Sequence, residues 1–328
     1  MTARMRTTVF TASAALALGV AALASGPARA ADVTLNAMSF VAHDLPYSWP
    51  LIELADKVNK SGKGIHIEVK PDGTMSPFAI GNAVKTGVVD LAVLPFTFYQ
   101  NLLPIGDAMK LSTLPEAEIK KNGTMAFLDE LHMQKVNAHI LALYGSDVKF
   151  FLYLRDKKIS TPDLKGLKLR ITPIYRAAFR AFGADVVQMA PGDVYTALER
   201  GTIDGYGWTN QDLKKIGWAK YTKYRVEPGF FAVWSNFLVN ADTWKKLTPD
   251  QQAYLRSEAV AAGDHFDAQA PALNAKYEKE QDEVGIQVIR FEGKVKDQFL
   301  KTAYEASWEE AEKLDPKNAA KLRKLISK

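Results

Sequence analysis

Residues 77–90, PFAIGNAVKTGVVD, are repeated 114 positions later in residues 191–204, PGDVYTALERGTID. Each copy begins with Pro, which favours the first turn of a helix, and each then reaches a Gly of the kind that ends one. After that Gly, each copy continues through an apolar residue and an Asp into a run that predicts a strand. The repeat therefore predicts the same helix-to-strand unit in each of two α/β lobes.

The places of the two copies also predict a cleft between the lobes. In open α/β sheets, ligands bind beyond the carboxyl ends of the strands. The residues just beyond the two copies, 94–99 and 206–210, should therefore face each other.

Strand and helix patterns alternate through the rest of the chain, which favours an α/β fold. No low-complexity linker separates the lobes, so we expect the chain to cross between them more than once. Lobe I is expected to take residues 31–155 and to be completed by part of 240–328. Lobe II is expected to take residues 156–239 and to be completed by part of 250–328.

A long helix is predicted at about 249–284. Thr248 and Gln251 match a capping box, and Pro249 stands in the first turn. A helix of this length spans about 50 Å, which exceeds the size of one lobe. We therefore expect it to cross both lobes, with a kink at Pro271.

The first 30 residues predict export through a signal peptide. Arg4 and Arg6 precede an uncharged run at 9–24, and residues 28–30, ARA, match a small-x-small cleavage site. The alternative is a membrane anchor, but the run is shorter than the roughly 20 residues that a membrane span needs. We expect a mature protein that begins near Ala31.

The composition of the remaining 298 residues excludes several classes of protein. They hold 39 basic and 37 acidic residues, and the absence of a long basic run argues against nucleic-acid binding. The absence of Cys excludes disulfides and thiol chemistry. Two lobes with apolar cores are compatible with this length and with 47% hydrophobic residues.

The search for catalytic motifs gives no positive result. The chain lacks GxSxG around Ser146, and 205–207, GYG, lacks the third Gly of a dinucleotide loop. The five His residues have no metal-ligand spacing; they stand at 43, 66, 132, 139 and 265. We therefore expect no enzyme, no metal and no cofactor, while a hydrolase or lyase stays a weaker alternative.

One cation has a promising position. In residues 161–173, TPDLKGLKLRITP, Arg170 ends a short apolar strand and Pro173 turns the chain. A guanidinium on a rigid element can pair a carboxylate through two parallel hydrogen bonds. The residues alone also allow a surface charge at this position.

Four segments together resemble the DctP-type solute-binding proteins of tripartite ATP-independent periplasmic (TRAP) transporters. They are DLKGLKLR at 163–170, FGAD at 182–185 with Met189, VYTALERGTIDG at 194–205 and AVKTGVVD at 83–90. The resemblance covers nearly all of the chain after the first 30 residues. It implies a two-lobed periplasmic-binding-protein fold with a hinge, which closes on a ligand in the inter-lobe cleft.

The resemblance also implies a role and two site residues. The role is a receptor in the periplasm that delivers its ligand to a permease of small and large membrane subunits. Arg170 corresponds to the family's carboxylate clamp, and Trp208 to a ligand contact four residues after the Asp of the IDG motif. A sensing subunit with the same fold stays an alternative, and a monomer is expected.

Two departures from the family narrow the ligand. Many dicarboxylate and sialic-acid members have a second Arg about twenty residues before the clamp, where this chain has Phe150. Members that bind 2-oxo acids through a metal tend to have Glu where this chain has Gly207. We therefore expect one carboxylate and no metal, with C4-dicarboxylates and 2-oxo acids as alternatives.

Aromatic residues are concentrated at the expected edges of the cleft. The alternative is that about half of them pack in the cores of the lobes and do not contact a ligand. They are Phe96, Phe98, Tyr99, Phe150, Tyr153, Tyr206, Trp208, Phe231 and Trp234. Candidates for orienting polar groups are Asn236, Gln211, Thr172 and His43. The resulting hypothesis is a monocarboxylate with an aromatic or apolar body.

Overall fold

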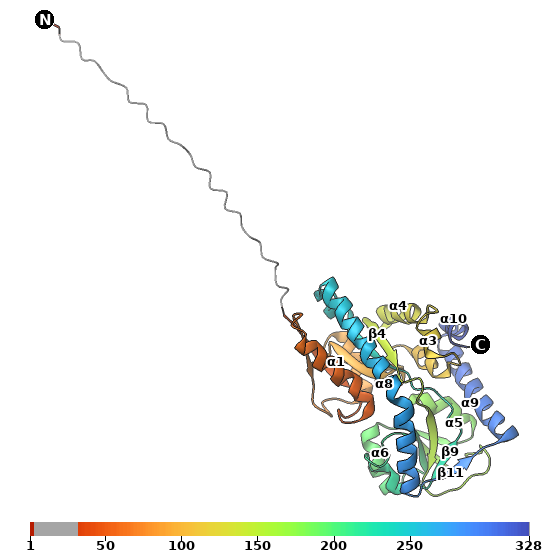
Figure 1. Ribbon diagram of the computed structural model, residues 1–328. Helices are drawn as coiled ribbons and strands as arrows, with labels where there is room; N and C mark the ends of the chain where they lie inside the picture. Colours follow the sequence, from red (N-terminus) through yellow and green to blue (C-terminus); the bar gives the residue numbers. More distant parts are fainter. Residues whose placement is uncertain (3–31, 328) are drawn as a thin grey trace. The chain divides into compact units, whose positions relative to one another are not determined.

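Two β-sheets form the framework of the fold (Figure 1). The computed structural model describes residues 1–2 and 32–327, so the expected signal peptide lies outside the described residues. The first sheet has the order β2-β1-β3-β10-β4; its strands are β1 (Val33–Ser39), β2 (Ile65–Val69), β3 (Leu91–Pro95), β4 (Ala138–Tyr144) and β10 (Ser235–Asn240). The second has the order β11-β9-β5-β8-β6-β7; its strands are β5 (Phe150–Leu154), β6 (Lys168–Ile171), β7 (Asp185–Gln188), β8 (Gly205–Thr209), β9 (Tyr224–Glu227) and β11 (Gln287–Arg290).

Helices surround both sheets. The α-helices are α1 (Trp49–Lys60), α2 (Pro77–Thr86), α3 (Glu116–Ile119), α4 (Thr124–Val136), α5 (Arg176–Ala181), α6 (Pro191–Glu199), α7 (Ala241–Lys246), α8 (Pro249–Glu283), α9 (Gly293–Leu314) and α10 (Pro316–Ile326). The short 3-10 helices are η1 (Pro46–Ser48), η2 (Phe96–Tyr99), η3 (Pro104–Leu111), η4 (Pro173–Tyr175) and η5 (Trp218–Tyr221). Within the described ranges, no helix combines the length and the apolar character that crossing a bilayer requires.

The two copies of the repeat build the same unit in both sheets. In one, α2 leads into β3, which lies parallel to β1; in the other, α6 leads into β8, which lies parallel to β6. Gly87 and Gly201 both have the positive φ angles, 75° and 63°, that favour Gly after a helix. The predicted helix-to-strand unit is confirmed in each lobe.

The repeated Asp has the same task in each copy. The Asp90 carboxylate accepts the backbone N–H of Asn36 in β1 at 2.9 Å, and that of Asp204 accepts the N–H of Lys168 in β6 at 2.7 Å. The backbone N–H of each Asp donates back to the carbonyl of the same partner, at 2.9 and 2.8 Å. Each Asp thus joins its strand to the parallel neighbour at the point where the strand begins.

The chain crosses between the sheets more than once, as expected, but at other places. β5 pairs antiparallel with β8 and β9 in the second sheet, and β10 pairs antiparallel with β3 and β4 in the first. The crossings therefore precede Phe150 and Ser235 and do not coincide with the expected boundaries at 155 and 239. Both strands are wholly buried, and an apolar run does not reveal which of two sheets it joins.

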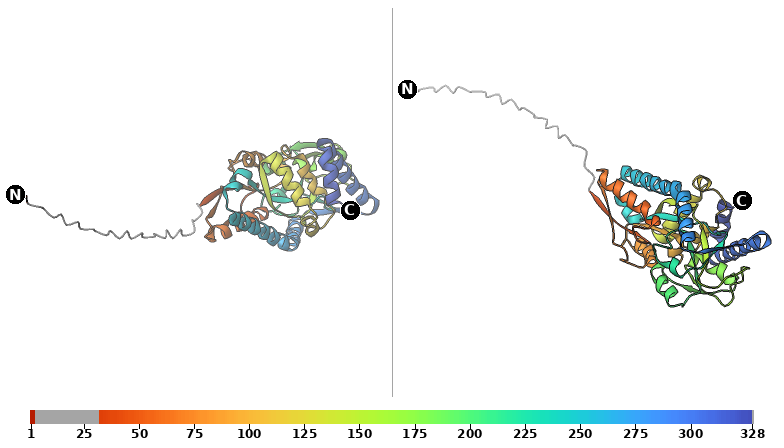
Figure 2. Two further views of the ribbon diagram at one scale, coloured as in Figure 1. Left: turned by 90° about the horizontal axis from the view of Figure 1, so that it is seen from above. Right: turned by 60° about the horizontal axis from the view of Figure 1, so that its bottom comes forward.

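The long helix α8 connects both lobes. The capping box of Thr248 and Gln251 is present, and Pro271 lies inside the helix. Its first half packs against β4 and α1, beside which it lies in Figures 1 and 2. Its second half reaches the second lobe, where the Gln281 amide donates to the carbonyl of Asn210 at 2.6 Å. The expected crossing of both lobes is therefore observed.

Two carboxyl groups, one of them in α8, bind the segment between β4 and β5, where the chain first crosses from one sheet to the other. Asp267 in α8 accepts the backbone N–H of Gly145 at 2.6 Å, and Glu116 accepts the hydroxyl hydrogen of Ser146 at 2.5 Å. The two carboxyl groups lie within 4.8 Å of each other. Burial and the nearby Glu116 raise the pKa of Asp267 to about 8, so Asp267 holds a proton at neutral pH.

This proton predicts how stability depends on pH. The unfolded Asp titrates near pH 4 and the folded one near 8, so the free energy of unfolding falls as pH rises between these values. Asp267→Asn keeps the acceptor for Gly145 and removes the titration, so it should be more stable than the wild type at pH 9 by about 4–5 kcal/mol, and about equal at pH 4. Urea denaturation at both pH values measures this. Asp282→Asn, at an exposed position near the other end of the same helix, is the control, and parallel pH profiles of Asp267→Asn and the wild type would contradict the assignment.

Candidate functional site

Arg170 is the centre of the candidate site. It lies in β6 with a relative exposure of 0%. Its Nε donates to the carbonyl of Met189 at 3.0 Å and its Nη1 to that of Gly207 at 3.2 Å. Nη2 has no hydrogen-bond partner, and no acidic residue of the described chain forms an ion pair with this guanidinium. The buried guanidinium therefore has one donor without a partner and no counter-charge from the described chain.

Burial acts against the charge of Arg170 but does not remove it. Loss of hydration lowers its pKa to about 10, so it stays protonated at neutral pH. Two indole rings offset part of the cost: the guanidinium carbon lies 5.6 Å from the centroid of the Trp208 ring and 5.7 Å from that of Trp218. Such cation–π contacts are worth about 0.5–2 kcal/mol each, well below the cost of burying a charge. The site is thus electrostatically incomplete.

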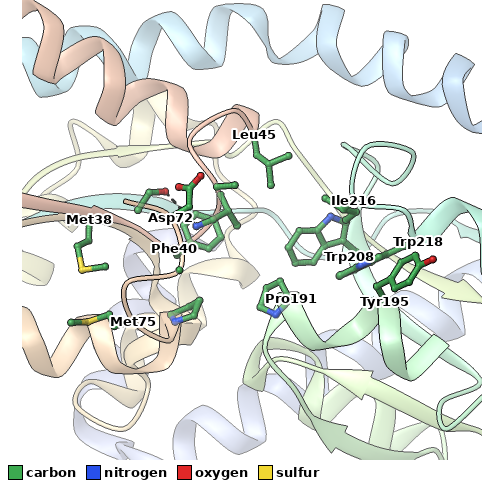
Figure 3. A pocket seen from close by; sticks show the side chains of 16 residues that line it. Met38, Phe40, Leu45, Asp72, Met75, Pro191, Tyr195, Trp208, Ile216 and Trp218 are labelled. Atoms are coloured by element: carbon green, nitrogen blue, oxygen red, sulfur yellow. Dashed lines mark hydrogen bonds between the residues drawn. The ribbon is translucent and has the colours of Figure 1, made fainter. Parts of the chain in front are cut away.

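A cavity of about 330 Å³ adjoins the two indoles (Figure 3). One wall comes from the first lobe and the other from the second. The labelled residues of the first wall are Met38, Phe40, Leu45, Asp72 and Met75. Those of the second wall are Pro191, Tyr195, Trp208, Ile216 and Trp218. Asp72 is the single ionised side chain among the lining residues, so the cavity is mostly apolar.

A second, narrow cavity of about 20 Å³ lies deeper and shares Phe40 and Trp208 with the first. The other residues that line it are Tyr47, Pro95, Thr97, Phe98, Phe150, Thr172, Tyr175, Thr209 and Val233. Trp208 therefore lines both spaces, and the surface that borders the deeper one is almost wholly apolar.

Gly207 makes the close packing behind the deeper cavity possible. A Cβ atom at this position would lie 2.6 Å from the ring of Tyr175. That ring is buried and meets Phe150 edge-on at 5.2 Å between centroids. The ring of Tyr175 thus occupies the space that a side chain at position 207 would fill, and it covers one face of β8. The carbonyl group of Gly207 accepts a hydrogen bond from Nη1 of Arg170.

Several residues expected at the site line these cavities. Trp208 lines both, and Phe98, Phe150 and Thr172 line the deeper one. His43 lies at the rim of the larger cavity, where its backbone N–H donates to the Asp72 carboxylate at 3.0 Å. Arg170 lines neither space; its guanidinium lies against the ring of Trp208, which borders both spaces, and that of Trp218, which borders the larger.

Other expected residues line neither cavity. Phe96 packs against Gly106 and meets His132 edge-on, and Tyr206 stacks on Tyr153 with its hydroxyl 2.7 Å from that of Thr222. Trp234, Asn236 and Gln211 are also buried away from the cavities, and Gln211 donates to Asn274 in α8 at 3.2 Å. The indole N–H of Trp234 and the side-chain amide of Asn236 have no hydrogen-bond partner among the described residues. The aromatic or polar character of these residues indicated neither their pairing nor the side of the lobe on which they lie.

The structure adds residues that sequence reasoning did not select. Phe40 and Leu45 come after β1, and the rule that ligands bind beyond the carboxyl ends of strands could have identified them. Tyr195 stands inside the second copy of the repeat and could have been found there. Ile216 and Trp218 lie after β8 in a segment without any regular pattern, so no sequence signal indicated them.

The model of the DctP family, described as bacterial extracellular solute-binding protein family 7, matches residues 51–314. The chain belongs to this family. A TRAP periplasmic solute-binding protein from Desulfovibrio salexigens, solved with bound orotic acid, has a TM-score of 0.81 at 18% identity over 89% of this chain and 97% of that one. This similarity confirms the two-lobed α/β fold.

Curated relatives are similar in sequence. The 2,3-diketo-L-gulonate-binding periplasmic protein of Escherichia coli is 26% identical over 260 residues, which are 71% of this chain and 74% of that protein. The monocarboxylate 2-oxoacid-binding periplasmic protein of a Nostoc strain is 32% identical over 120 residues, only 36% of this chain and 33% of that protein. The family thus consists of solute-binding proteins and not of enzymes.

The packing of Tyr175 on Gly207 predicts the effect of a single methyl group. Gly207→Ala should destabilise the protein by about 1–3 kcal/mol, because the added Cβ must displace a buried ring. Gly192→Ala is the matched control, since no atom lies within 4 Å of the Cβ it adds in α6. Urea denaturation compares the two, and equal stability of both variants would show that the ring adapts without cost.

Proposed function

We propose that this protein is the extracytoplasmic receptor of a TRAP transporter and that it binds a monocarboxylate with an aromatic or apolar body. The observation that carries the proposal is the wholly buried guanidinium of Arg170, which has a free donor and no acidic partner in the described chain. A ligand carboxylate supplies the missing negative charge and accepts the hydrogen bond that Nη2 does not make.

The lining of the cavities supports a single carboxylate. Phe150 stands where many dicarboxylate-binding members have Arg, and its ring lines the deeper cavity. Neither of these two cavities is lined by a Lys or an Arg, and Arg170 lies behind the indoles of the larger one. A second carboxylate would therefore enter apolar surroundings without a counter-charge, which is unfavourable. The methionine, leucine and indole surfaces of the larger cavity instead suit an apolar body.

Metal-assisted binding finds little support at position 207. Gly207 has no side chain to act as a ligand, and a Glu there would collide with the ring of Tyr175. The partial match to a 2-oxo acid-binding protein nevertheless makes a 2-oxo acid the second candidate.

The proposed cycle needs no chemical step. The ligand contacts residues of both lobes, so binding favours the closed arrangement over an open one. Closure removes water from the ion pair, and the lower dielectric strengthens it. The closed form would then deliver the acid to the permease in the membrane.

Replacement of Arg170 separates binding from stability. Arg170→Met keeps most of the volume but removes the charge, so acid binding should weaken by about 30-fold to several thousand-fold. Without ligand, the variant should be as stable as the wild type or more stable, because it no longer buries an unpaired charge. Titration calorimetry and thermal unfolding measure the two effects.

The matched control is Arg225→Met, in the same lobe. Arg225 is also buried, but it donates to Glu227 at 2.5 Å and to Gln281 at 3.0 Å. This variant should lose stability, because it removes one of the two cations that pair with Glu227 and the donor to the Gln281 side chain, and it should keep more of its acid affinity than Arg170→Met. Unchanged affinity in Arg170→Met would reject the clamp.

A thermal-shift screen with benzoate, orotate, pyruvate and succinate tests the ligand class. An acid at 100 times its dissociation constant adds about 2.7 kcal/mol, which corresponds to several degrees in a protein of this size. We expect responses to benzoate or orotate that exceed those to pyruvate and succinate. A response to succinate alone would exclude the monocarboxylate assignment, and one to pyruvate alone would favour the 2-oxo acid.

A further inference from the structure

The turn η4 of the second lobe is held by two side chains from the segment that comes after the central strand β3 of the first sheet. The backbone N–H of Ile174 donates to the Thr97 hydroxyl at 2.9 Å. The carbonyl of the same residue accepts the ammonium of Lys110 at 2.7 Å. Both polar groups of one peptide residue are therefore bound by side chains 77 and 64 positions away in sequence.

Lys110 is fixed in this position by its own surroundings. Its side chain has a relative exposure of 4%, as has that of Asp107, which accepts it at 2.7 Å. The ring of Phe231 lies 5.1 Å from the ammonium. A buried ion pair contributes little to stability compared with apolar residues of the same size, whereas it does fix geometry. The pair thus presents one N–H donor at a defined place.

The held residue lies within the site described above. Ile174 stands between Thr172 and Tyr175, which both line the deeper cavity. The ring of Tyr175 covers Gly207, and the carbonyl of Gly207 accepts from Arg170. A continuous series of contacts therefore leads from Lys110 through the η4 turn to the guanidinium.

We propose that Thr97 and Lys110 are positioning residues that form a latch on Ile174. The latch forms when the lobes approach, and it sets the η4 turn so that Tyr175 and Arg170 are in place for the ligand. The proposal that the latch holds the lobes together is based on these contacts alone. The proposal that the latch raises ligand affinity rests on the proposed function. Because the Lys110–Asp107 pair is already neutral, closing the latch adds no new net charge to the interior.

The chain offers a clean way to test the conformational part. It contains no Cys, so two engineered Cys residues carry the only spin labels. Asn82→Cys in α2 and Thr196→Cys in α6 are exposed positions that correspond in the two copies of the repeat. Pulsed electron–electron resonance between them reports the separation of the lobes without and with benzoate, orotate or pyruvate.

We expect the labelled wild type to show a short-distance population that Thr97→Val and Lys110→Met reduce. Loss of a hydrogen bond to a charged group should lower the ratio of short to long distances by about ten-fold or more in Lys110→Met, and by less in Thr97→Val. Thr97→Ser keeps the hydroxyl and should retain the wild-type ratio. Any acid of the three that binds the wild type should bind the Val and Met variants more weakly by the same factors.

Three results would overturn the latch. One is an unchanged distance distribution in both variants, even if their melting temperatures fall, because this shows a purely structural role. Another is the absence of a short-distance population in the wild type under all conditions. The third is a Thr97→Ser variant that behaves like Thr97→Val. If no acid binds but the distances shift as expected, the proposed ligand fails and the latch stands.

Discussion

A guanidinium that is removed from water without an acidic partner is the constraint on which the second lobe depends. Arg170 is held by two carbonyl groups and lies against two indoles, and none of these carries a formal negative charge. Arg225, also buried in the same lobe, has an acidic partner in Glu227, which it shares with Arg290. The lobe therefore contains one buried Arg with an acidic partner and one without. The Arg without such a partner lies against the two indoles that line the larger cavity.

The repeat explains why the two lobes are similar in construction and different in chemistry. Asp90 and Asp204 make the same pair of bonds to a parallel neighbour strand, so the two carboxyl strand ends are placed alike. The segments that come after these two strands differ. After β3 the chain forms the buried turn η2 with Phe98 and Thr97, whereas β8 carries Trp208 next to its last residue and leads to Trp218. Two lobes of similar construction thus give the cavity one mostly apolar wall, from the first lobe, and one wall with Arg170 behind it, from the second.

Local sequence patterns predicted local structure well. They failed where contacts with distant segments determine which sheet a strand joins or which way a side chain points. The repeat, the capping box at Thr248 and the short strand that carries Arg170 all depend on residues close together in sequence. The sheet to which β5 or β10 belongs depends on which distant edge is open, and their apolar runs are alike. Phe96 and Phe98 stand two residues apart in one turn, yet only Phe98 reaches a cavity. Aromatic character indicates burial, and the direction of a side chain comes from the packing around it.

In the proposed cycle, the two buried cations near the η4 turn divide the control of closure between them. Lys110 forms a neutral pair with Asp107 within one helical turn, so it can bind the carbonyl of Ile174 whether or not a ligand is present. Arg170 lacks such a partner, so its environment becomes neutral only when an anion enters. If both cations were paired within the protein, closure would be favourable without ligand, and the receptor would not distinguish its loaded from its empty state. If neither were paired, closure would require the burial of two uncompensated charges, which one carboxylate cannot neutralise. One paired and one unpaired cation is the arrangement in which a single carboxylate decides the outcome.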